Sequence, residues 1–454
     1  MTRLNKEKLP VAIIGGGPVG LAAAAHLVKK GEEFILFEAG RQIGASVLEW
    51  GHVRMFSPWQ YNIDQVAKEL LDAEGWSTPN LEDVPNGSEL VNDYLVPLSE
   101  IPSIKKRMVL NAKIVGVAKH GLDKLKTSDR TKRPFDLYVE VDGETTVYQA
   151  KAIIDASGTW KNPNPSLSNG IWTKAEKNLS EHITYGIPDV LGDKGTKYSN
   201  KTVMVVGSGH SAINTLLDLA KLKATYKDTK IIWVLRKNHV RDVYGGQEND
   251  QLPARGKLGI RIQELVETEA IQILTPFYIN QIINNGTKIT VEGTLNDTDY
   301  TVNHIDEMIV ATGFRPDTSF LNEVRISLDP ALESVEALAP LIDPNIHSCG
   351  TVRPHGEEEL RQPEEGFYIV GMKSYGRAPT FLLATGYEQV RSVVAYLTGD
   401  FKGAKEVQLI LPETGVCNSG ANVDCCEIEV AKPQTNSCCV EAKVEVKSSS
   451  CCGS

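Results

Sequence analysis

VAIIGGGPVG, the stretch at residues 11–20, decides the fold of this chain. Its first four residues form a continuous apolar run, which is typical of a buried parallel strand, and a glycine-rich turn follows. Gly15 permits a tight turn, Gly17 lets the backbone approach a pyrophosphate, and Gly20 allows a helix to pack closely against the strand. Residues 21–30 are rich in alanine and predict that helix, whose N-terminus attracts phosphate. The stretch therefore predicts a dinucleotide site.

An acidic residue completes this first unit. The apolar residues 34–37 predict a second strand, which ends at Glu38. Glu38 lies 18 residues beyond Gly20, where a carboxylate accepts hydrogen bonds from ribose hydroxyls. A glycine pattern alone would be a weak signal, but here the strand, the helix and the acid all occur at the expected spacing.

The same pattern recurs from Thr202. Apolar residues 203–206 lead into GSGHSA at 207–212, in which Ala212 replaces the third glycine, a tolerated variant. A further apolar run, 231–235, predicts the second strand of this unit. The chain therefore contains two dinucleotide-binding units.

Basic side chains end the second unit where the first unit has an acid. Arg236 and Lys237 directly follow the predicted strand. A carboxylate there would repel a 2′-phosphate, whereas an arginine pairs with it through two hydrogen bonds. Arg236 therefore favours NADPH over NADH; the alternative is that it only begins a solvated basic loop, since charged residues are common after strands.

Strands that end in small residues mark where the chain passes between the two units. AIIDASG at 152–158 and EMIVATG at 307–313 are such segments. We predict an α/β protein in which one Rossmann-like dinucleotide-binding domain is inserted into another, followed by a disordered cysteine-rich tail. The expected boundaries are 1–164 and 306–402 for the two parts of the first domain, 165–305 for the inserted domain and 403–454 for the tail.

Composition limits the function classes. The chain has 454 residues and a formal net charge of −10, so it lacks the basic footprint that nucleic acid or an anionic membrane requires. No apolar stretch reaches the roughly 20 residues of a membrane helix. The N-terminus also lacks the separate apolar region of a signal peptide. We expect a cytoplasmic protein with no nucleic-acid and no membrane partner.

Together these motifs resemble the flavoproteins with two dinucleotide-binding domains, the superfamily that includes the flavin-containing monooxygenases and the thioredoxin reductases. The resemblance rests on GGGPVG with Glu38, GSGHSA with Arg236, and ATGFRPD at 311–317, and it covers roughly residues 8–400. It implies that the first unit binds FAD and the second binds NADPH. The FAD residues that it implies are Gly15, Gly17, Pro18, Val19, Gly20, Glu38, Gly158 and Gly371. The NADPH residues that it implies are Gly207, Ser208, Gly209, His210, Ser211, Ala212, Arg236, Lys237 and Gly313.

The cysteines separate the branches of this superfamily. Seven of the eight crowd into residues 417–452, and none precedes Cys349. A thioredoxin-reductase assignment requires a C-x-x-C beside the second turn, and a glutathione-reductase assignment requires one near the first helix. The chain resembles the monooxygenase branch more, because that branch needs only NADPH, FAD and a shielded site. The F-x-G-x-x-x-H motif of that branch is absent, and residues 182–186 match it only loosely.

The same resemblance assigns two further positions. Asn62 resembles the active-site asparagine that monooxygenases place near the flavin, although a turn asparagine after Pro58 explains it equally well. Gly371 begins a segment that contacts FAD in related flavoproteins, but Met372 stands where an aspartate is usual. Asn62 is thus the candidate catalytic residue.

The C-terminal cysteines form a repeat. Vicinal pairs begin at 425, 438 and 451, each 13 residues after the last. Neighbouring thiolates are good ligands for soft metal ions, whereas a disulfide between adjacent cysteines is strained. We expect them to bind As(III), Sb(III) or Hg(II); zinc is disfavoured because the tail has no histidine and no C-x-x-C. The predicted ligands are Cys417, Cys425, Cys426, Cys438, Cys439, Cys451 and Cys452.

The sequence also resembles flavoproteins encoded beside arsenic-resistance genes, including the stretch HSCGTVRPHG at 347–356. We therefore predict an FAD- and NADPH-dependent oxidoreductase, monooxygenase-like and linked to the detoxification of thiophilic metals or metalloids. The alternative is a binding protein whose tail sequesters As(III) or Hg(II) while the flavoprotein body acts as a redox sensor. The expected partners are a small-molecule or metalloid substrate and molecular oxygen, and a homodimer is left open.

Overall fold

Two parallel five-stranded sheets organise the chain, each built around one of the two glycine turns. The computed structural model describes residues 6–250, 252–346, 354–379 and 381–409. The apolar runs before the turns form strands that are buried along their length, as expected for parallel strands covered on both faces. The predicted α/β class with two Rossmann-like units is confirmed.

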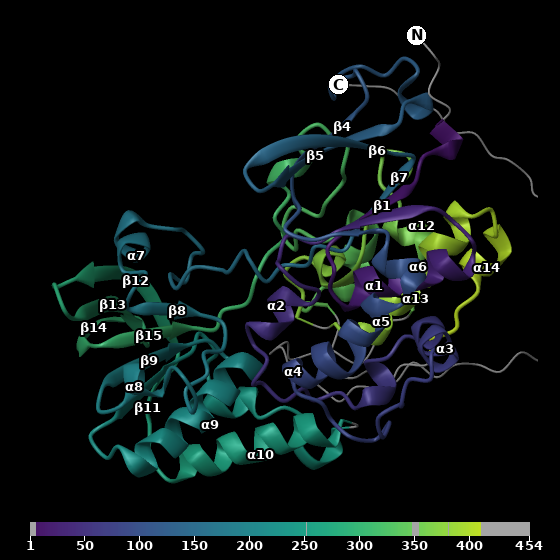
Figure 1. The fold of residues 1–454 in the computed structure, drawn as a ribbon. Helices are drawn as coiled ribbons and strands as arrows, with labels where there is room; N and C mark the ends of the chain where they lie inside the picture. The colour runs from purple at the N-terminus through teal and green to yellow at the C-terminus, as the bar shows by residue number, and fades with distance from the viewer. Residues whose placement is uncertain (1–5, 251, 347–353, 380, 410–454) are drawn as a thin grey trace, which may run out of the picture. The chain divides into compact units, whose positions relative to one another are not determined.

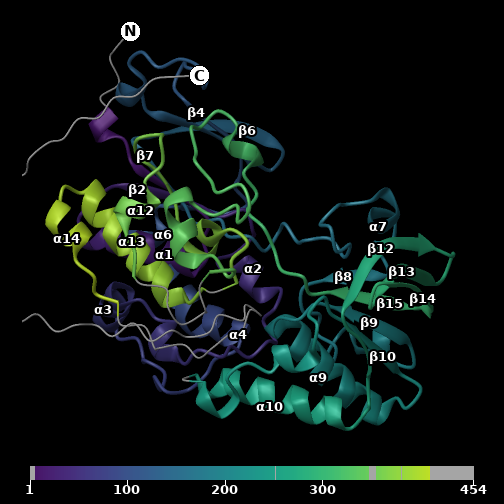
Figure 2. The ribbon, with the colours of Figure 1, turned by 180° about the vertical axis from the view of Figure 1, so that it is seen from behind.

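The first sheet has the strand order β16-β7-β1-β2-β3, and every neighbouring pair is parallel. Its strands are β1 (Val11–Ile14), β2 (Phe34–Phe37), β3 (Met108–Val109), β7 (Ala152–Asp155) and β16 (Phe367–Ile369). Two long helices, α1 (Pro18–Lys29) and α13 (Leu383–Leu397), lie side by side against this sheet (Figures 1 and 2). The first of them begins at Pro18, because the missing N–H of a proline is not needed in the first turn of a helix.

Shorter helices surround this sheet. They are α2 (Ala45–Leu48), α3 (Gln65–Ala73), α4 (Gly87–Glu89), α5 (Val96–Glu100), α6 (Pro102–Lys105), α11 (Ala339–Ile342), α12 (Glu357–Leu360) and α14 (Phe401–Lys405).

The second sheet has the order β11-β10-β9-β15-β8 and is also parallel throughout. Its strands are β8 (Ile183–Tyr185), β9 (Thr202–Val206), β10 (Lys230–Val234), β11 (Gln272–Leu274) and β15 (Glu307–Val310). Its helices are α7 (Lys174–Asn178), α8 (Gly195–Tyr198), α9 (His210–Thr225) and α10 (Pro253–Glu267). Alternate side chains of β9 enter two different cores, since successive residues of a strand point to opposite faces. Val203 and Val205 pack toward α9 and α10, whereas Met204 and Val206 pack toward an antiparallel sheet.

Each parallel sheet is accompanied by a three-stranded antiparallel sheet. The sheet beside β9 consists of β12 (Phe277–Asn284), β13 (Ile289–Leu295) and β14 (Thr298–Ile305), as Figure 1 shows. The other consists of β4 (Lys113–Lys119), β5 (Phe135–Val141) and β6 (Glu144–Ala150), which leads directly into β7.

Sheet membership corrects one predicted boundary. The strand β15 pairs with β9 and β8 of the second sheet, so residues 307–310 do not belong to the first domain, as the boundary at 305/306 implied. The chain returns to the first domain only after Val310, the last residue of β15. The sequence could not show this, because β7 and β15 are both followed by a segment of small residues. Only the pairing of the strands shows that β7 belongs to the first sheet and β15 to the second.

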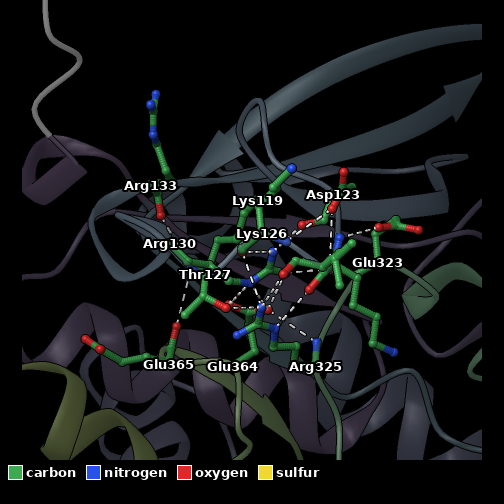
Figure 3. Close-up of polar contacts among 12 residues, drawn as sticks. Lys119, Asp123, Lys126, Thr127, Arg130, Arg133, Glu323, Arg325, Glu364 and Glu365 are labelled. Atoms are coloured by element: carbon green, nitrogen blue, oxygen red, sulfur yellow. Dashed lines mark hydrogen bonds and ion pairs between the residues drawn. The ribbon is translucent and has the colours of Figure 1, made fainter.

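A buried ion pair joins the β4–β6 sheet to the C-terminal half of the first domain. Arg130 and Glu364 are both nearly inaccessible, and the guanidinium Nη2 lies 2.6 Å from the carboxylate Oε2. Figure 3 shows how the remaining N–H groups of Arg130 are used: they donate to the backbone carbonyls of Asp123, Lys126 and Glu323. The backbone N–H of Arg325 also donates to Glu364. Because every charged atom has partners, this pair holds together segments that are far apart in sequence.

The structure also moves the start of the tail. The helix α14 extends through Lys405, with Asp400 as its N-cap and Ser392 of α13 donating to the carbonyl of Ala404 at 2.6 Å. Residues 403–405 thus belong to the folded body, contrary to the predicted boundary at 402/403. The rest of the predicted tail from residue 410 lies outside the described residues. Among the helices that the structure describes, none has the length and apolarity needed to cross a membrane.

Candidate active site

The first glycine turn has the shape of a pyrophosphate cradle. Gly15 has a φ of +102°, and a Cβ on it would lie 2.7 Å from the carbonyl oxygen of Ala156. A Cβ on Gly20 would lie 1.9 Å from the carbonyl oxygen of Gly15, so the helix can approach the turn only without a side chain there. Gly17, the N-cap of α1, faces open space and has no side-chain cap bond. The uncapped helix N-terminus behind Gly17, with Pro18 and Val19 in its first turn, fits the phosphates of FAD.

Glu38 is held ready at the end of β2. Its two carboxylate oxygens accept hydrogen bonds from the backbone N–H groups of Gly16 and Gly40, each at 2.7 Å. Each carboxylate oxygen has a second lone pair, so Glu38 keeps acceptors for ribose hydroxyls. By accepting the hydrogen bond from Gly16, the carboxylate also stabilises the first glycine turn.

The predicted segment at Gly371 is a short helix, η9 (Gly371–Tyr375), fixed by buried polar contacts. The backbone N–H of Gly371 donates to Gln389 of α13 at 2.7 Å. Lys373 is 1% exposed, and its Nζ lies 2.7 Å from Oδ2 of Asp155 at the end of β7 and 3.0 Å from Oγ of Ser157. Gly158, with a φ of +70°, follows on the same segment and faces open space. This pairing ties η9 to the small-residue segment that packs on the first glycine turn.

Sequence reasoning missed Lys373. The signal was present, because a carboxylate at the end of a fully buried strand requires a cation or several donors. Nothing local indicated which lysine would supply it.

The second glycine turn repeats the first. Gly207 has a φ of +136°, and a Cβ on it would lie 2.3 Å from the carbonyl oxygen of Ala311. Gly209 is the uncapped N-cap of α9 and faces open space, while Ala212 is fully buried where the third glycine would stand. Ser208 and Ser211 line the same cavity as Gly207 and Gly209.

His210 begins α9 and stays neutral. Its ring centroid lies 5.2 Å from that of Phe56. Burial lowers the pKa of His210 to about 4, and the nearby Arg255 adds to this effect. Arg255 is itself bound by both carboxylate oxygens of Asp250, at 2.7 and 2.8 Å. An uncharged imidazole therefore stands at this helix N-terminus.

The second turn opens into a large cavity. A hollow of about 1270 Å³ is lined by Gly207–Ser211 and Gly313 of the second unit and by Met372, Tyr375 and Thr385 of the first. Its lining holds six cationic residues against one acid, Asp242, although the whole chain is acidic. The cations in the lining are Arg236, Lys237, Arg241, Arg255, Arg315 and Arg377. Such a surplus suits the phosphates of a dinucleotide.

Arg236 lies where the sequence predicts, at the cavity wall after β10. It is exposed, and its Nη1 donates to the carbonyl of Ser168 at 3.1 Å. The other guanidinium nitrogens make no hydrogen bond to the described residues, so they are available to a phosphate. The backbone carbonyl of Lys237 accepts a hydrogen bond from Thr275.

Asn62 does not offer its amide to a ligand. The side chain is fully buried; its Oδ1 accepts from Oγ of Ser57 at 2.8 Å, and its Nδ2 donates to the carbonyl of Ser57 at 2.7 Å. Its own carbonyl accepts a hydrogen bond from the hydroxyl of Tyr387. The geometry therefore favours the turn role that the sequence left open over the catalytic role assigned by resemblance.

The predicted metal ligands cannot be placed. These ligands, Cys417 and the three vicinal cysteine pairs, all lie outside the described residues, and so does Cys349, which was not among them. Within the described ranges, no three histidine, cysteine, aspartate or glutamate side chains gather as a metal site.

Comparisons with known proteins agree with this geometry. A family model described as pyridine nucleotide-disulphide oxidoreductase matches residues 9–362. The chain is 24% identical over 350 residues to a ferredoxin–NADP reductase of Lactobacillus johnsonii, covering 76% of this chain and 86% of that protein.

Two solved structures show the same fold. One is a bacillithiol disulfide reductase of Bacillus cereus, with a TM-score of 0.63 at 19% identity over 86% of this chain and 99% of the other. The second is an FAD-bound cadaverine monooxygenase of Erwinia amylovora, with a TM-score of 0.60 at 11% identity over 89% and 98%. The predicted enzyme class, an oxidoreductase that uses FAD and NADPH, is confirmed.

Proposed function

Because the chain belongs to the pyridine nucleotide-disulphide oxidoreductase family, we propose that it reduces a bound FAD with NADPH and delivers the electrons to a small acceptor in the cavity, as monooxygenases do. The single observation that carries this proposal is the cavity lined both by the second glycine turn and by η9. FAD, when bound, supplies the capacity to take a hydride and to pass electrons to oxygen or to a substrate. A shared cavity is what hydride transfer requires, because nicotinamide and flavin must meet face to face.

The residues of this chain would divide the work as follows. The turns at Gly15–Gly20 and Gly207–Ala212 hold pyrophosphates on two helix N-termini. Glu38 holds a ribose, and Arg236 holds the 2′-phosphate. Lys373 with Asp155 would keep η9 in place as part of the FAD site. No acid–base residue is needed for the hydride step itself.

The acceptor is not a dithiol of the core. No cysteine precedes Cys349, so the described part of the first domain offers no redox-active cysteine pair. The electrons would then pass to a molecule that enters the cavity. Molecular oxygen is the acceptor we favour, and the monooxygenase among the structural neighbours supports that choice through its fold alone.

The substrate class we propose is a thiophilic metal or metalloid, such as As(III), Sb(III) or Hg(II). Three vicinal cysteine pairs at a spacing of 13 residues support it, since paired thiolates bind soft ions. The same observation favours a second candidate, in which the tail only sequesters the ion and the flavoprotein body senses redox state.

The test is an assay of NADPH oxidation and oxygen uptake by the full chain. Arsenite, antimonite, mercuric ion and an amine are added in turn. We expect thiophilic ions to raise oxygen uptake, and we expect a full-length variant with serine in place of all seven tail cysteines to lose most of that response. An equal response from this variant, with ion binding lost, supports sequestration. A protein that stays colourless after addition of FAD contradicts the whole proposal.

A further inference from the structure

A closed ring of hydrogen bonds fixes both backbone polar groups of Gly371, the first residue of η9. The N–H of Gly371 donates to Oε1 of Gln389 at 2.7 Å, and Nε2 of Gln389 donates to Oγ of Ser374 at 3.0 Å. The Ser374 hydroxyl completes the ring by donating to the carbonyl of Gly371 at 2.7 Å. Because Gln389 and Ser374 are fully buried, bulk water does not compete for these hydrogen bonds.

His355 contacts this ring from the segment that precedes α12. Its Nε2 lies 2.9 Å from Nε2 of Gln389, and its ring centroid lies 5.5 Å from that of Tyr375. His355 is 4% exposed. The amide nitrogen of Gln389 carries two hydrogens; Ser374 accepts one of them, so the second is directed to His355.

The N–H of Gly371 decides which way the Gln389 amide faces. A backbone N–H can only donate, so the atom of Gln389 that faces it must be the oxygen. The NH₂ group then faces His355, whose Nε2 must accept. An imidazole nitrogen accepts only when it carries no proton, so His355 is neutral and its proton is on Nδ1. The ring is thus compatible with one tautomer of His355.

The position of Gly371 connects this ring to the first glycine turn. A Cβ on Gly371 would lie 3.2 Å from Cγ2 of Val19, and a Cβ on Gly386 of α13 would lie 2.6 Å from the same atom. Val19 is in the first turn of α1, the helix whose N-terminus fits the phosphates of FAD. Three elements therefore meet at one valine, so a shift of η9 would displace the turn that receives the cofactor.

We propose that His355 is a positioning residue for FAD, which acts through Gln389 by accepting the amide hydrogen that keeps Gln389 turned toward Gly371. Without that acceptor, a buried amide hydrogen loses its partner, and the amide no longer has a single favoured orientation. The N–H of Gly371 is then held less firmly. This inference rests on the proposed function only in that FAD occupies the first domain.

The test measures the release of FAD from the purified holoenzyme, by the rise in flavin fluorescence after dilution. His355→Phe keeps an aromatic ring beside Tyr375 and removes the acceptor. FAD release should become about tenfold faster, the equivalent of one lost buried hydrogen bond. His355→Gln is the conservative variant, since its side-chain oxygen can accept where Nε2 stood, and it should release FAD at the wild-type rate. The visible circular dichroism of the bound flavin should change in His355→Phe alone.

Ser392→Ala is the matched control. Ser392 lies on the same helix as Gln389 and is 1% exposed. Its hydroxyl accepts from the N–H of Glu357 at 2.9 Å and donates to the carbonyl of Ala404 at 2.6 Å, so it fastens the segment after His355 to α13 without joining the ring. This variant should lower the melting temperature and leave the release of FAD unchanged.

A measurement on the wild-type chain does not depend on the folding of any variant. In holoenzyme isotopically labelled at its histidine nitrogens, NMR distinguishes a ring nitrogen that carries a proton from one that does not. We expect one imidazole with a proton on Nδ1 and none on Nε2, and its signals should be missing from His355→Gln.

The possible failures are separable. If His355→Phe releases FAD no faster than the wild-type chain or Ser392→Ala, His355 has only a structural role and the inference is wrong. If His355→Gln releases FAD as fast as His355→Phe, or if NMR finds a proton on Nε2 of His355, the acceptor role is overturned. If the wild-type chain retains no FAD, the proposed function itself fails.

Discussion

Arg236 is the residue that we propose as the partner of the 2′-phosphate, which distinguishes NADPH from NADH. Arg236→Ala removes a guanidinium whose only hydrogen bond to the described residues is to the carbonyl of Ser168. We expect the KM for NADPH to rise by about tenfold or more, since charge-assisted hydrogen bonds to the 2′-phosphate are lost. The KM for NADH should change little. Steady-state kinetics with both nucleotides check this.

The control for this prediction is Arg261→Ala. Arg261 is exposed on α10 and does not line the cavity, so neither KM should change. Equal increases in both KM values for the Arg236 variant would refute the assignment of Arg236 to the 2′-phosphate.

Lys119 is a second residue whose burial has a measurable consequence. It is 1% exposed, and its Nζ lies 3.3 Å from the ring centroid of Phe135 and 3.4 Å from the carbonyls of Arg133 and Glu365 (Figure 3). Burial lowers the pKa of Lys119 to about 7. Below that pH the folded protein carries a poorly solvated charge; the penalty disappears as the pH rises from about 7 toward the ordinary pKa of about 10.4.

Lys119→Met should therefore raise the melting temperature more at pH 6 than at pH 9. We expect the difference between the two pH values to be about 1 °C or more, which corresponds to about 1 kcal/mol in a chain of this size. Thermal unfolding of both proteins at the two pH values measures it. Lys113→Met, at an exposed position of the same strand, is the control and should show no such trend. A shift that does not vary with pH would contradict a buried titrating lysine.

At the scale of the element, η9 shows how a short helix becomes a rigid part of the site. Its five residues cannot be stable alone, because helix nucleation is unfavourable. Lys373, Gln389 and Ser374 anchor it through hydrogen bonds to β7, to Gly371 and to one another. We therefore expect that loss of one of these hydrogen bonds weakens the binding of FAD.

Lys373→Met leaves the carboxylate of Asp155 buried without its cation. We expect a loss of roughly 3–5 kcal/mol in stability and of most bound FAD. The double variant Lys373→Met with Asp155→Asn removes the unpaired charge and should recover part of the stability. Melting temperature and the ratio of flavin to protein absorbance after gel filtration measure both. A double variant as unstable as the single one would show that the charge is not the cause.

At the scale of the whole molecule, the cavity arises because one nucleotide-binding unit is inserted between the halves of another. The two glycine turns are 192 residues apart in the chain, from Gly15 to Gly207, yet each packs on a strand end of the same kind. The two segments that connect the domains pair through one antiparallel bridge, between Pro163 and Phe314. Their neighbours Asn164 and Arg315 line the cavity that the second glycine turn shares with η9. The proposed chemistry depends on this arrangement and not on either unit alone.

The sequence by itself determined the two glycine turns, the acid at Glu38, the arginine at 236 and the absence of a dithiol before Cys349. These are local backbone requirements, so a few adjacent residues are enough to express them. Only the tertiary structure decided that β15 joins the second sheet, that Asn62 closes a turn, and that Lys373 pairs with Asp155. Lys373 and Asp155 are 218 residues apart, and Arg130 and Glu364 are 234 apart. A local pattern indicates that a buried charge needs a partner of opposite charge. Which residue becomes that partner depends on how segments that are distant in the sequence pack together.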